Sequence, residues 1–431
     1  MTMAGTLLRQ VRVVNPATGT DQVQDVLMTG GRWSAIAPTL DIDTDNLDVI
    51  DGTGKVLAPG LIDLYSHSGE PGHESRETLA DLMAGAITGG FTRLGILPDT
   101  APALDNPGAL RRLVDLACEL EQLPQPLLLP WAALTKGAQG EQMTELAELA
   151  NIQTFAIAGL ADGQPITNRV LLRRLLEYTR SLKRPLLLWP CDRTLAGNGI
   201  AREGALALMG GLPGVLVAAE TAALTTILEL VRELDTPVHL MRLSTARSVA
   251  LVERAKAEGL PITASTTWMH LLFSTQDALS YDPNLCLDPP LGNPTDQEAL
   301  IAGVKAGIID AIVIDHSPYT YEEKTVAFGD APPGAIGLEL AFTALWEQFV
   351  ASGRWTAVEL LRALSDRPAQ ILQLSSPQIT ERETVEAFLF DPAATWTVNP
   401  ETLRSPARNT PFYQRSLQGK VLETWHYPSL H

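Results

Sequence analysis

The sequence contains few cysteines, few aromatic residues and no long apolar run. Its three cysteines, Cys118, Cys191 and Cys286, are widely spaced and form no CxxC pair. This usage is typical of a reducing compartment and argues against a disulfide framework or a cysteine-built metal site. No run approaches the roughly 20 apolar residues of a spanning helix, and the N-terminal apolar stretch is too short for a secretory signal. We therefore expect a cytoplasmic protein with no membrane association.

Positive charge is also scarce. The chain has 32 lysines and arginines against 50 aspartates and glutamates, so its formal net charge is −18. A surface of this sign repels phosphate backbones and anionic lipids, which argues against nucleic-acid binding and membrane-surface binding. It favours solubility, or contact with a basic patch on a protein partner.

The centre of the chain alternates apolar, strand-like runs with amphipathic helical stretches such as 106–123 and 166–183. Near-continuous apolar strands separated by helices predict a parallel sheet that is buried on both faces. Eight such runs predict a closed (β/α)₈ barrel rather than an open sheet. The eight expected strands are 61–67, 91–97, 126–134, 154–159, 185–190, 237–243, 261–267 and 311–317.

Both ends of the chain have a different sequence pattern from the centre. Residues 6–57 consist of short alternating stretches separated by turns, for example at Gly30-Gly31, and the C-terminal segments EAFLFDPAATWTV and SLQGKVLETWHY resemble them. We therefore predict one small β-module built from residues 1–58 and 375–431, with the barrel over residues 59–374.

Several motifs resemble the dihydroorotase family of the amidohydrolase superfamily, in order and over almost the whole chain. The matching segments are APGLIDLYSHSGEPGHESRET (58–78), GGFTRLGILPDTAPALDNP (89–107), LSTARSVALVERAKAEGLPITASTTWMHLLFS (243–274), DPPLGNPTDQEALIAGVKAGIIDAIVIDHSPYTYEEK (288–324), PPGAIGLE (332–339) and NTPFYQRSLQGKV (409–421). The resemblance implies the interconversion of carbamoyl aspartate and dihydroorotate in pyrimidine biosynthesis. It also implies one or two divalent metals, usually zinc, at the ends of the barrel strands.

The metal ligands of the family are largely replaced. Where the family has His-x-His after the first strand, this chain has Tyr65-Ser66-His67. Trp189 lies where the fifth strand should end in a histidine, and Arg242 lies where the sixth should offer one. An arginine has no lone pair to offer and would repel a dication. Hydantoinase-like relatives use a carbamylated lysine on the fourth strand instead, but TFAIAGLADG has none and Lys136 lies too early.

The residues that the resemblance assigns to substrate binding are replaced as well. Gly69 occupies the position of an arginine that pairs with the substrate carboxylate. Asp99 and Asp288 occupy positions of asparagines, and Gly292 that of a second arginine. These four changes all weaken the binding of an anion.

His67 and Asp315 are the only metal-ligand or proton-transfer candidates that remain. We interpret both mainly as structural remnants, and the alternative is a weak metal ligand set. A buried carboxylate facing an empty site needs a partner. We therefore expect Arg242 to lie within salt-bridge reach of Asp315 or Asp162.

Our first interpretation is a catalytically inactive dihydroorotase-like protein that needs no cofactor. The resemblance implies that it acts as a structural or regulatory partner of aspartate transcarbamoylase; a homo-oligomer is the other assembly that we consider. The second interpretation is an active cyclic amidohydrolase with zinc held by His67, Asp315 and a further group. The third is a sensor that binds a small molecule in the barrel mouth, where bulky aromatics such as Trp189 lie.

Overall fold

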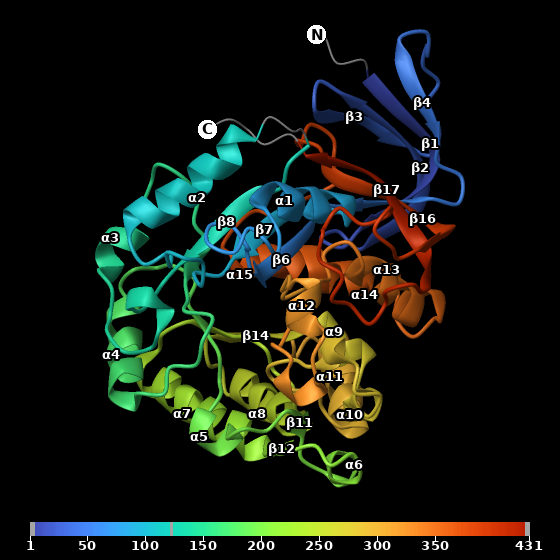
Figure 1. The fold of residues 1–431 in the computed structure, drawn as a ribbon. Coiled ribbons are helices and arrows are strands. Elements are labelled where there is room, and N and C mark those ends of the chain that lie inside the picture. Colours follow the sequence, from blue (N-terminus) through green and yellow to red (C-terminus); the bar gives the residue numbers. More distant parts are fainter. Residues whose placement is uncertain (1–4, 121–123, 427–431) are drawn as a thin grey trace.

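The computed structural model describes residues 5–120 and 124–426. A parallel barrel occupies its centre, and a β-module lies at one end (Figure 1). The barrel strands are β6 (Leu61–Ser66), β7 (Phe91–Ile96), β8 (Leu127–Ala132), β9 (Gly159–Leu160), β10 (Leu187–Leu188), β13 (Val238–Leu240), β14 (Ile262–Thr267) and β15 (Ala311–Val313).

Backbone hydrogen bonds close the eight strands into a ring. They form two four-stranded parallel sheets, β6-β7-β8-β9 and β10-β13-β14-β15. Leu160 N–H donates to the Pro185 carbonyl at 2.9 Å and joins the sheets on one side. On the other side, His67 N–H donates to the His316 carbonyl at 2.9 Å and Asp315 N–H to the Tyr65 carbonyl at 3.2 Å. The predicted (β/α)₈ barrel is confirmed.

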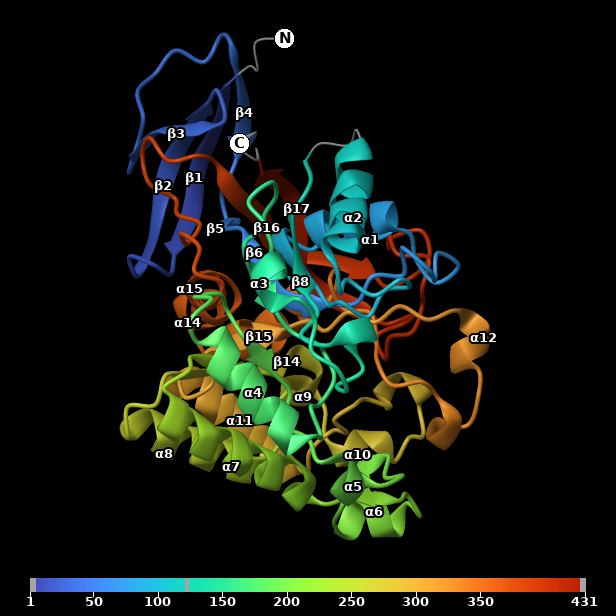
Figure 2. The same cartoon turned by 90° about the vertical axis from the view of Figure 1, so that its left-hand side faces the viewer.

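Helices surround the barrel, as Figure 2 shows for α4, α7 and α8. Asn106 begins α2 by accepting from Ala109 N–H at 3.0 Å, and Pro107 occupies the first helical position, where a missing N–H has no cost. Residues 121–123 of the predicted 106–123 helix lie outside the described residues. The helices are α1 (Leu79–Thr88), α2 (Pro107–Glu119), α3 (Leu146–Ala150), α4 (Arg169–Thr179), α5 (Arg193–Ala196), α6 (Ala205–Met209), α7 (Val217–Leu234), α8 (Ala246–Ala257), α9 (Trp268–Leu272), α10 (Thr275–Ala278), α11 (Pro294–Ala306), α12 (Tyr321–Lys324), α13 (Ala341–Leu345), α14 (Ala357–Leu361) and α15 (Arg367–Ile371).

The fourth barrel strand differs from the expectation. Residues 154–159 were expected to form it, but the ladder contains only Gly159 and Leu160 of β9. Pro130 in the adjacent β8 has no N–H, so it cannot donate to the segment before β9, and Ala158 only donates to its carbonyl at 2.9 Å. The short pairing follows from this missing donor.

Segments near both ends of the chain form one mixed sheet, with parallel and antiparallel strand pairs, as predicted. Its main path runs β17-β16-β5-β1-β2-β3, and β4 pairs with β1. The boundaries at residues 58 and 375 remain a prediction. The strands are β1 (Gly5–Asn15), β2 (Thr20–Thr29), β3 (Arg32–Ala37), β4 (Leu47–Asp51), β5 (Val56–Pro59), β16 (Glu386–Thr397) and β17 (Ser416–His426), and a separate pair is β11 (Ala201–Arg202) with β12 (Gly214–Val215).

The inside of the barrel is packed and largely apolar, which gives the site above it a rigid floor. Alternate side chains of the strands point inward, and α15 contributes to closing the barrel. The interior cluster comprises Ile62, Leu64, Tyr65, Leu97, Leu129, Trp131, Ala158, Ala161, Leu187, Trp189, Met241, Ala311, Val313, Ala369 and Leu372.

His239 on β13 is a buried polar residue of the barrel wall. It is 3% exposed, and its ring nitrogens form hydrogen bonds with Thr263 Oγ1 at 2.8 Å and Ser265 Oγ at 2.9 Å on β14. Burial and the charge of Lys256 lower the pKa of His239 to about 3. The imidazole is therefore neutral at physiological pH and serves as a strand-to-strand link.

This burial predicts acid sensitivity. The unfolded chain protonates His239 below a pKa of about 6.5, whereas the folded chain does so only near 3. The unfolded state thus binds more protons in this window, and folding stability is lost as pH falls from 6.5 toward 3, by about 3 kcal/mol at pH 4. Between pH 6.5 and 4, the free energy of unfolding of wild type should fall by this amount relative to that of His239→Gln. Urea unfolding of both proteins at the two pH values measures this change. Parallel stability curves would contradict the prediction.

Candidate functional site

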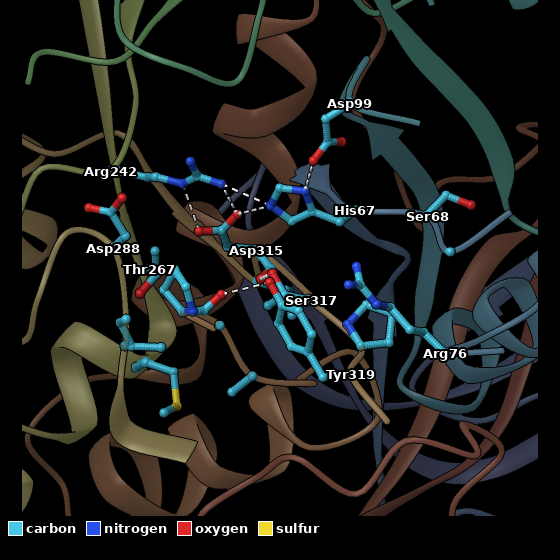
Figure 3. Close-up of a pocket in the computed structure, with 18 of the residues that line it drawn as sticks. His67, Ser68, Arg76, Asp99, Arg242, Thr267, Asp288, Asp315, Ser317 and Tyr319 are labelled. Atoms are coloured by element: carbon cyan, nitrogen blue, oxygen red, sulfur yellow. Dashed lines mark hydrogen bonds and ion pairs between the residues drawn. The ribbon is translucent and has the colours of Figure 1, made fainter. Parts of the chain in front are cut away.

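The candidate site lies at the barrel mouth, in a cavity of about 210 Å³. Figure 3 shows Asp315 at its centre, with Arg242 and His67 directed toward its carboxylate. Arg242 follows β13 and Asp315 follows β15, so the carboxyl ends of two barrel strands place them there. Both have positive φ, 56° for Arg242 and 53° for Asp315, a strained backbone for residues other than glycine.

Arg242 and Asp315 form a two-pronged ion pair. Arg242 Nε donates to Asp315 Oδ2 at 2.8 Å and Nη2 donates to Oδ1 at 2.6 Å. The Arg242 side chain is only 4% exposed. Burial alone would raise the pKa of Asp315, but the charge of Arg242 and hydrogen bonds from His67 and Arg242 lower it far below its ordinary value. Asp315 is therefore ionised, and both of its oxygens accept from the guanidinium.

The Arg242 guanidinium makes further contacts besides those with Asp315. Nη1 donates to the Gly163 carbonyl at 3.1 Å, and the guanidinium carbon lies 4.6 Å from the centre of the Trp189 ring. The Arg242 backbone N–H donates to the Tyr65 hydroxyl at 3.1 Å, and that hydroxyl also forms a 3.1 Å hydrogen bond with Ser265. Arg242 thus connects the ends of several barrel strands.

Asp99 has a role that the sequence did not indicate. Its Oδ2 lies 2.5 Å from His67 Nδ1, while His67 Nε2 lies 3.4 Å from Asp315 Oδ1 and 3.0 Å from Arg242 Nη2. Burial lowers the pKa of His67, but Asp99 and Asp315 more than offset this and raise it to about 9. A neutral ring could accept from Arg242, but two carboxylates face one guanidinium, so charge balance favours the protonated imidazole. Nε2 and Nη2 then share Oδ1 of Asp315.

Further ion pairs surround the cavity. Arg193 donates to Asp288 at 2.6 Å and lies over Trp189 at 4.6 Å, and Arg76 binds Glu323 at 2.5 Å and lies over Tyr319. The sequence did not indicate either arginine, because their partners lie 247 and 95 residues away along the chain. Each of the arginines Arg76, Arg193 and Arg242 at the mouth therefore already has a carboxylate partner.

Only one of the two glycines that the resemblance places at substrate-binding positions, Gly69 and Gly292, lines the cavity. Gly69 lines the cavity, and a Cβ there would lie 2.3 Å from the Glu77 carbonyl oxygen, so this loop has no space for a side chain at that position. Gly292 is not among the lining residues; its carbonyl accepts from Thr275 N–H at 2.7 Å. Asp162, the other partner expected for Arg242, does not pair with it. Asp162 instead accepts from the Thr135 N–H at 2.9 Å and from the Thr135 hydroxyl at 2.6 Å.

The donor set does not fit a zinc ion. Zinc needs about four lone-pair donors that converge on one point. Here both nitrogens of His67 face carboxylates, and the positively charged guanidinium of Arg242 occupies both oxygens of Asp315. Among residues 5–120 and 124–426, no group of three or more histidine, cysteine, aspartate or glutamate side chains has an arrangement that could hold a metal ion.

Comparisons with known proteins identify the fold class. An L-hydantoinase (dihydropyrimidinase) from Arthrobacter aurescens matches with a TM-score of 0.83 at 20% identity, over 98% of this chain and 95% of that one. A dihydropyrimidinase from Brevibacillus agri matches with a TM-score of 0.77 at 20% identity, over 97% and 94% of the two chains. The chain has the fold of these two proteins.

Sequence comparisons then show the family. A model described as "Dihydro-orotase-like" matches residues 54–246. A "Probable dihydroorotase-like protein" of Synechocystis sp. is 42% identical over 96% of this chain and 98% of its own length. A dihydroorotase of Solibacter usitatus is 33% identical over 97% and 96% of the two chains. The chain belongs to the dihydroorotase-like family.

The Arg242–Asp315 pair predicts a large loss of stability in Arg242→Ala. Removing one partner of a buried ion pair leaves an uncompensated charge and typically costs about 3–5 kcal/mol. The matched control is Arg354→Ala, whose guanidinium pairs with the exposed Glu298 at 3.1 Å and which should change stability by less than about 0.5 kcal/mol. Urea unfolding measures both. If Arg242→Ala has the wild-type midpoint with an unchanged slope, Arg242 does not carry this stability.

Proposed function

We propose that this chain is a dihydroorotase-like protein of pyrimidine biosynthesis that no longer catalyses the reaction, needs no metal, and acts as a structural or regulatory partner of aspartate transcarbamoylase. The observation that carries the proposal is the two-pronged contact between Arg242 and Asp315. In the family, the resemblance assigns proton transfer to the aspartate at this position. A general base must have a pKa near the working pH and a free oxygen that reaches the substrate. Asp315 has neither.

Substrate binding gives a second line of support. Carbamoyl aspartate is an anion, and its carboxylates need unpaired cationic or hydrogen-bonding groups. In the described part of the mouth, the arginines Arg76, Arg193 and Arg242 are already paired, and Asp99 and Asp288 are themselves paired with His67 and Arg193. Gly69 offers no side chain. The site neutralises its own charges, which leaves little to attract this substrate.

The second candidate is an active zinc-dependent cyclic amidohydrolase, favoured by the relatives called dihydroorotase. In that case His67 and Asp315 would bind the ion, and the Arg242 side chain would have to leave Asp315. A zinc-bound water would supply the nucleophile. The third candidate, a small-molecule sensor, is favoured by the cavity of about 210 Å³, which would have to recognise its ligand without free charged groups.

We expect purified protein to contain well under one equivalent of zinc and to show no turnover in either direction, because imidazole ligands are replaced by Tyr65, Trp189 and Arg242. Elemental analysis measures the metal, and absorbance at the dihydroorotate band measures turnover. A dihydroorotase with an intact His-x-His motif, purified in parallel, is the positive control. Stoichiometric zinc that disappears in His67→Ala would refute this part of the proposal.

The partner is tested separately. We expect the protein to co-elute with aspartate transcarbamoylase of the same organism in size-exclusion chromatography with light scattering, as one species heavier than either protein. An unrelated barrel protein of similar charge is the control. Separate elution at micromolar concentrations would remove the partner from the proposal and leave the loss of activity unaffected.

A further inference from the structure

Helix α4 and the turn after it form a basic face on an otherwise acidic protein. Six of the 32 lysines and arginines of the chain fall within residues 169–184, which contain one acidic residue, Glu177. Five of the six are exposed and make up the face as defined here: Arg169, Arg173, Arg174, Arg180 and Lys183. The buried side of the helix is leucine-rich and packs against the barrel, so these charges point outward.

The basic face is only partly neutralised within the chain. Arg173 pairs with Glu177 at 2.8 Å, whereas Arg169 and Arg180 only approach Asp192 and Asp235 at 3.9 and 4.0 Å. Arg174 and Lys183 have no ion pair with any residue of 5–120 or 124–426. The face also exposes apolar surface, because Val170 and Tyr178 are 63% and 45% exposed. Val170, Arg174 and Tyr178 are spaced four residues apart and lie in one row along the helix.

The complementary charge lies in the β-module. Residues 41–51, DIDTDNLDVID, are called the acidic segment here; they contain five aspartates, all exposed, and no basic residue. The segment ends in β4, which pairs with β1 on one side only and exposes Val49 at 46%. Within the described residues, no aspartate of the segment forms an ion pair. Five like charges at this spacing repel one another, and a cationic surface would relieve that repulsion.

Protection of an open strand edge explains only part of this pattern. Charged residues on edge strands prevent unwanted strand pairing, and Asp48 and Asp51 on β4 suit that purpose. Asp41, Asp43 and Asp45 precede the strand and have no edge to protect. Edge protection therefore does not explain the charge of these three aspartates.

The two surfaces cannot meet within one chain. Figures 1 and 2 show α4 and β4 at opposite ends of the molecule, α4 beside the barrel and β4 at the far edge of the β-module. Their dimensions agree, because the 11-residue helix and the five-residue strand each extend about 16 Å. Each combines charge with exposed valine or tyrosine side chains, the mixture found in specific interfaces.

We propose that this protein associates with a second copy of itself by docking the basic face of α4 against the acidic segment of its neighbour. Opposite charge steers the two copies into register, and Val170 and Tyr178 cover the apolar side of Val49. Because the paired surfaces differ and lie at opposite ends, the contact is head-to-tail. Such contacts build rings or open chains instead of stopping at a two-fold dimer.

Sedimentation velocity of the full chain tests the proposal. At about 0.1 M salt the Debye length is about 10 Å and we expect species larger than a dimer whose mass rises with concentration; at about 1 M salt, where it is about 3 Å, association should weaken at least about tenfold. The double variant Arg174→Glu/Lys183→Glu should be monomeric. Asp45→Lys/Asp48→Lys should be monomeric as well, because it removes most of the negative charge of the acidic segment.

Mixing the two double variants is the decisive step. The intact basic face of Asp45→Lys/Asp48→Lys then meets the intact acidic segment of Arg174→Glu/Lys183→Glu, so the mixture should form a 1:1 heterodimer although neither variant associates alone. Arg112→Glu/Lys136→Glu changes the net charge by the same amount as Arg174→Glu/Lys183→Glu, at exposed positions elsewhere, and should associate like wild type. A monomeric wild type at low salt, an assembly that persists in both double variants, or a mixture that stays monomeric would each overturn the proposal.

Discussion

The contact between Arg242 and Asp315 organises the barrel mouth. Two opposite charges are removed from water there, and such burial is stable only when geometry and further hydrogen bonds compensate the lost hydration. The compensation is extensive: Asp315 accepts from Arg242 at both oxygens, and Arg242 also donates to the Gly163 carbonyl and lies against Trp189. Because these partners follow different strands, the pair holds the open end of the barrel together.

The stability of the barrel and the chemistry of its mouth depend on different residues. The apolar interior below the mouth packs without help from a cofactor, while reactivity requires free lone pairs at the strand ends. In this chain those lone pairs are engaged by His67 and Arg242. The chain keeps the fold of the hydantoinase structures, while both oxygens of the Asp315 carboxylate at its mouth accept from an arginine.

Much of the architecture could be predicted from local patterns. Apolar runs located the barrel strands, and the Gly30-Gly31 turn and the matching C-terminal strands located the β-module. The fourth strand was misplaced because Pro130, a residue of the neighbouring strand, limits its pairing. The expected Arg242–Asp315 pair is present in the structure, but Asp99 was interpreted only through the substrate it would repel. Its contact with His67 depends on two strand ends that are 32 residues apart in the sequence.

The sequence by itself determined the family and the barrel and placed Tyr65, Trp189 and Arg242 near expected strand ends, because these depend on residue type and local order. Only the tertiary structure decided how the remaining charges are neutralised. Arg193 with Asp288 and Arg76 with Glu323 join segments that are 95 and 247 residues apart, and no periodicity or motif indicates such a contact. The physical reason is that charge compensation at the mouth depends on the convergence of eight strand ends, and that convergence exists only in the closed barrel.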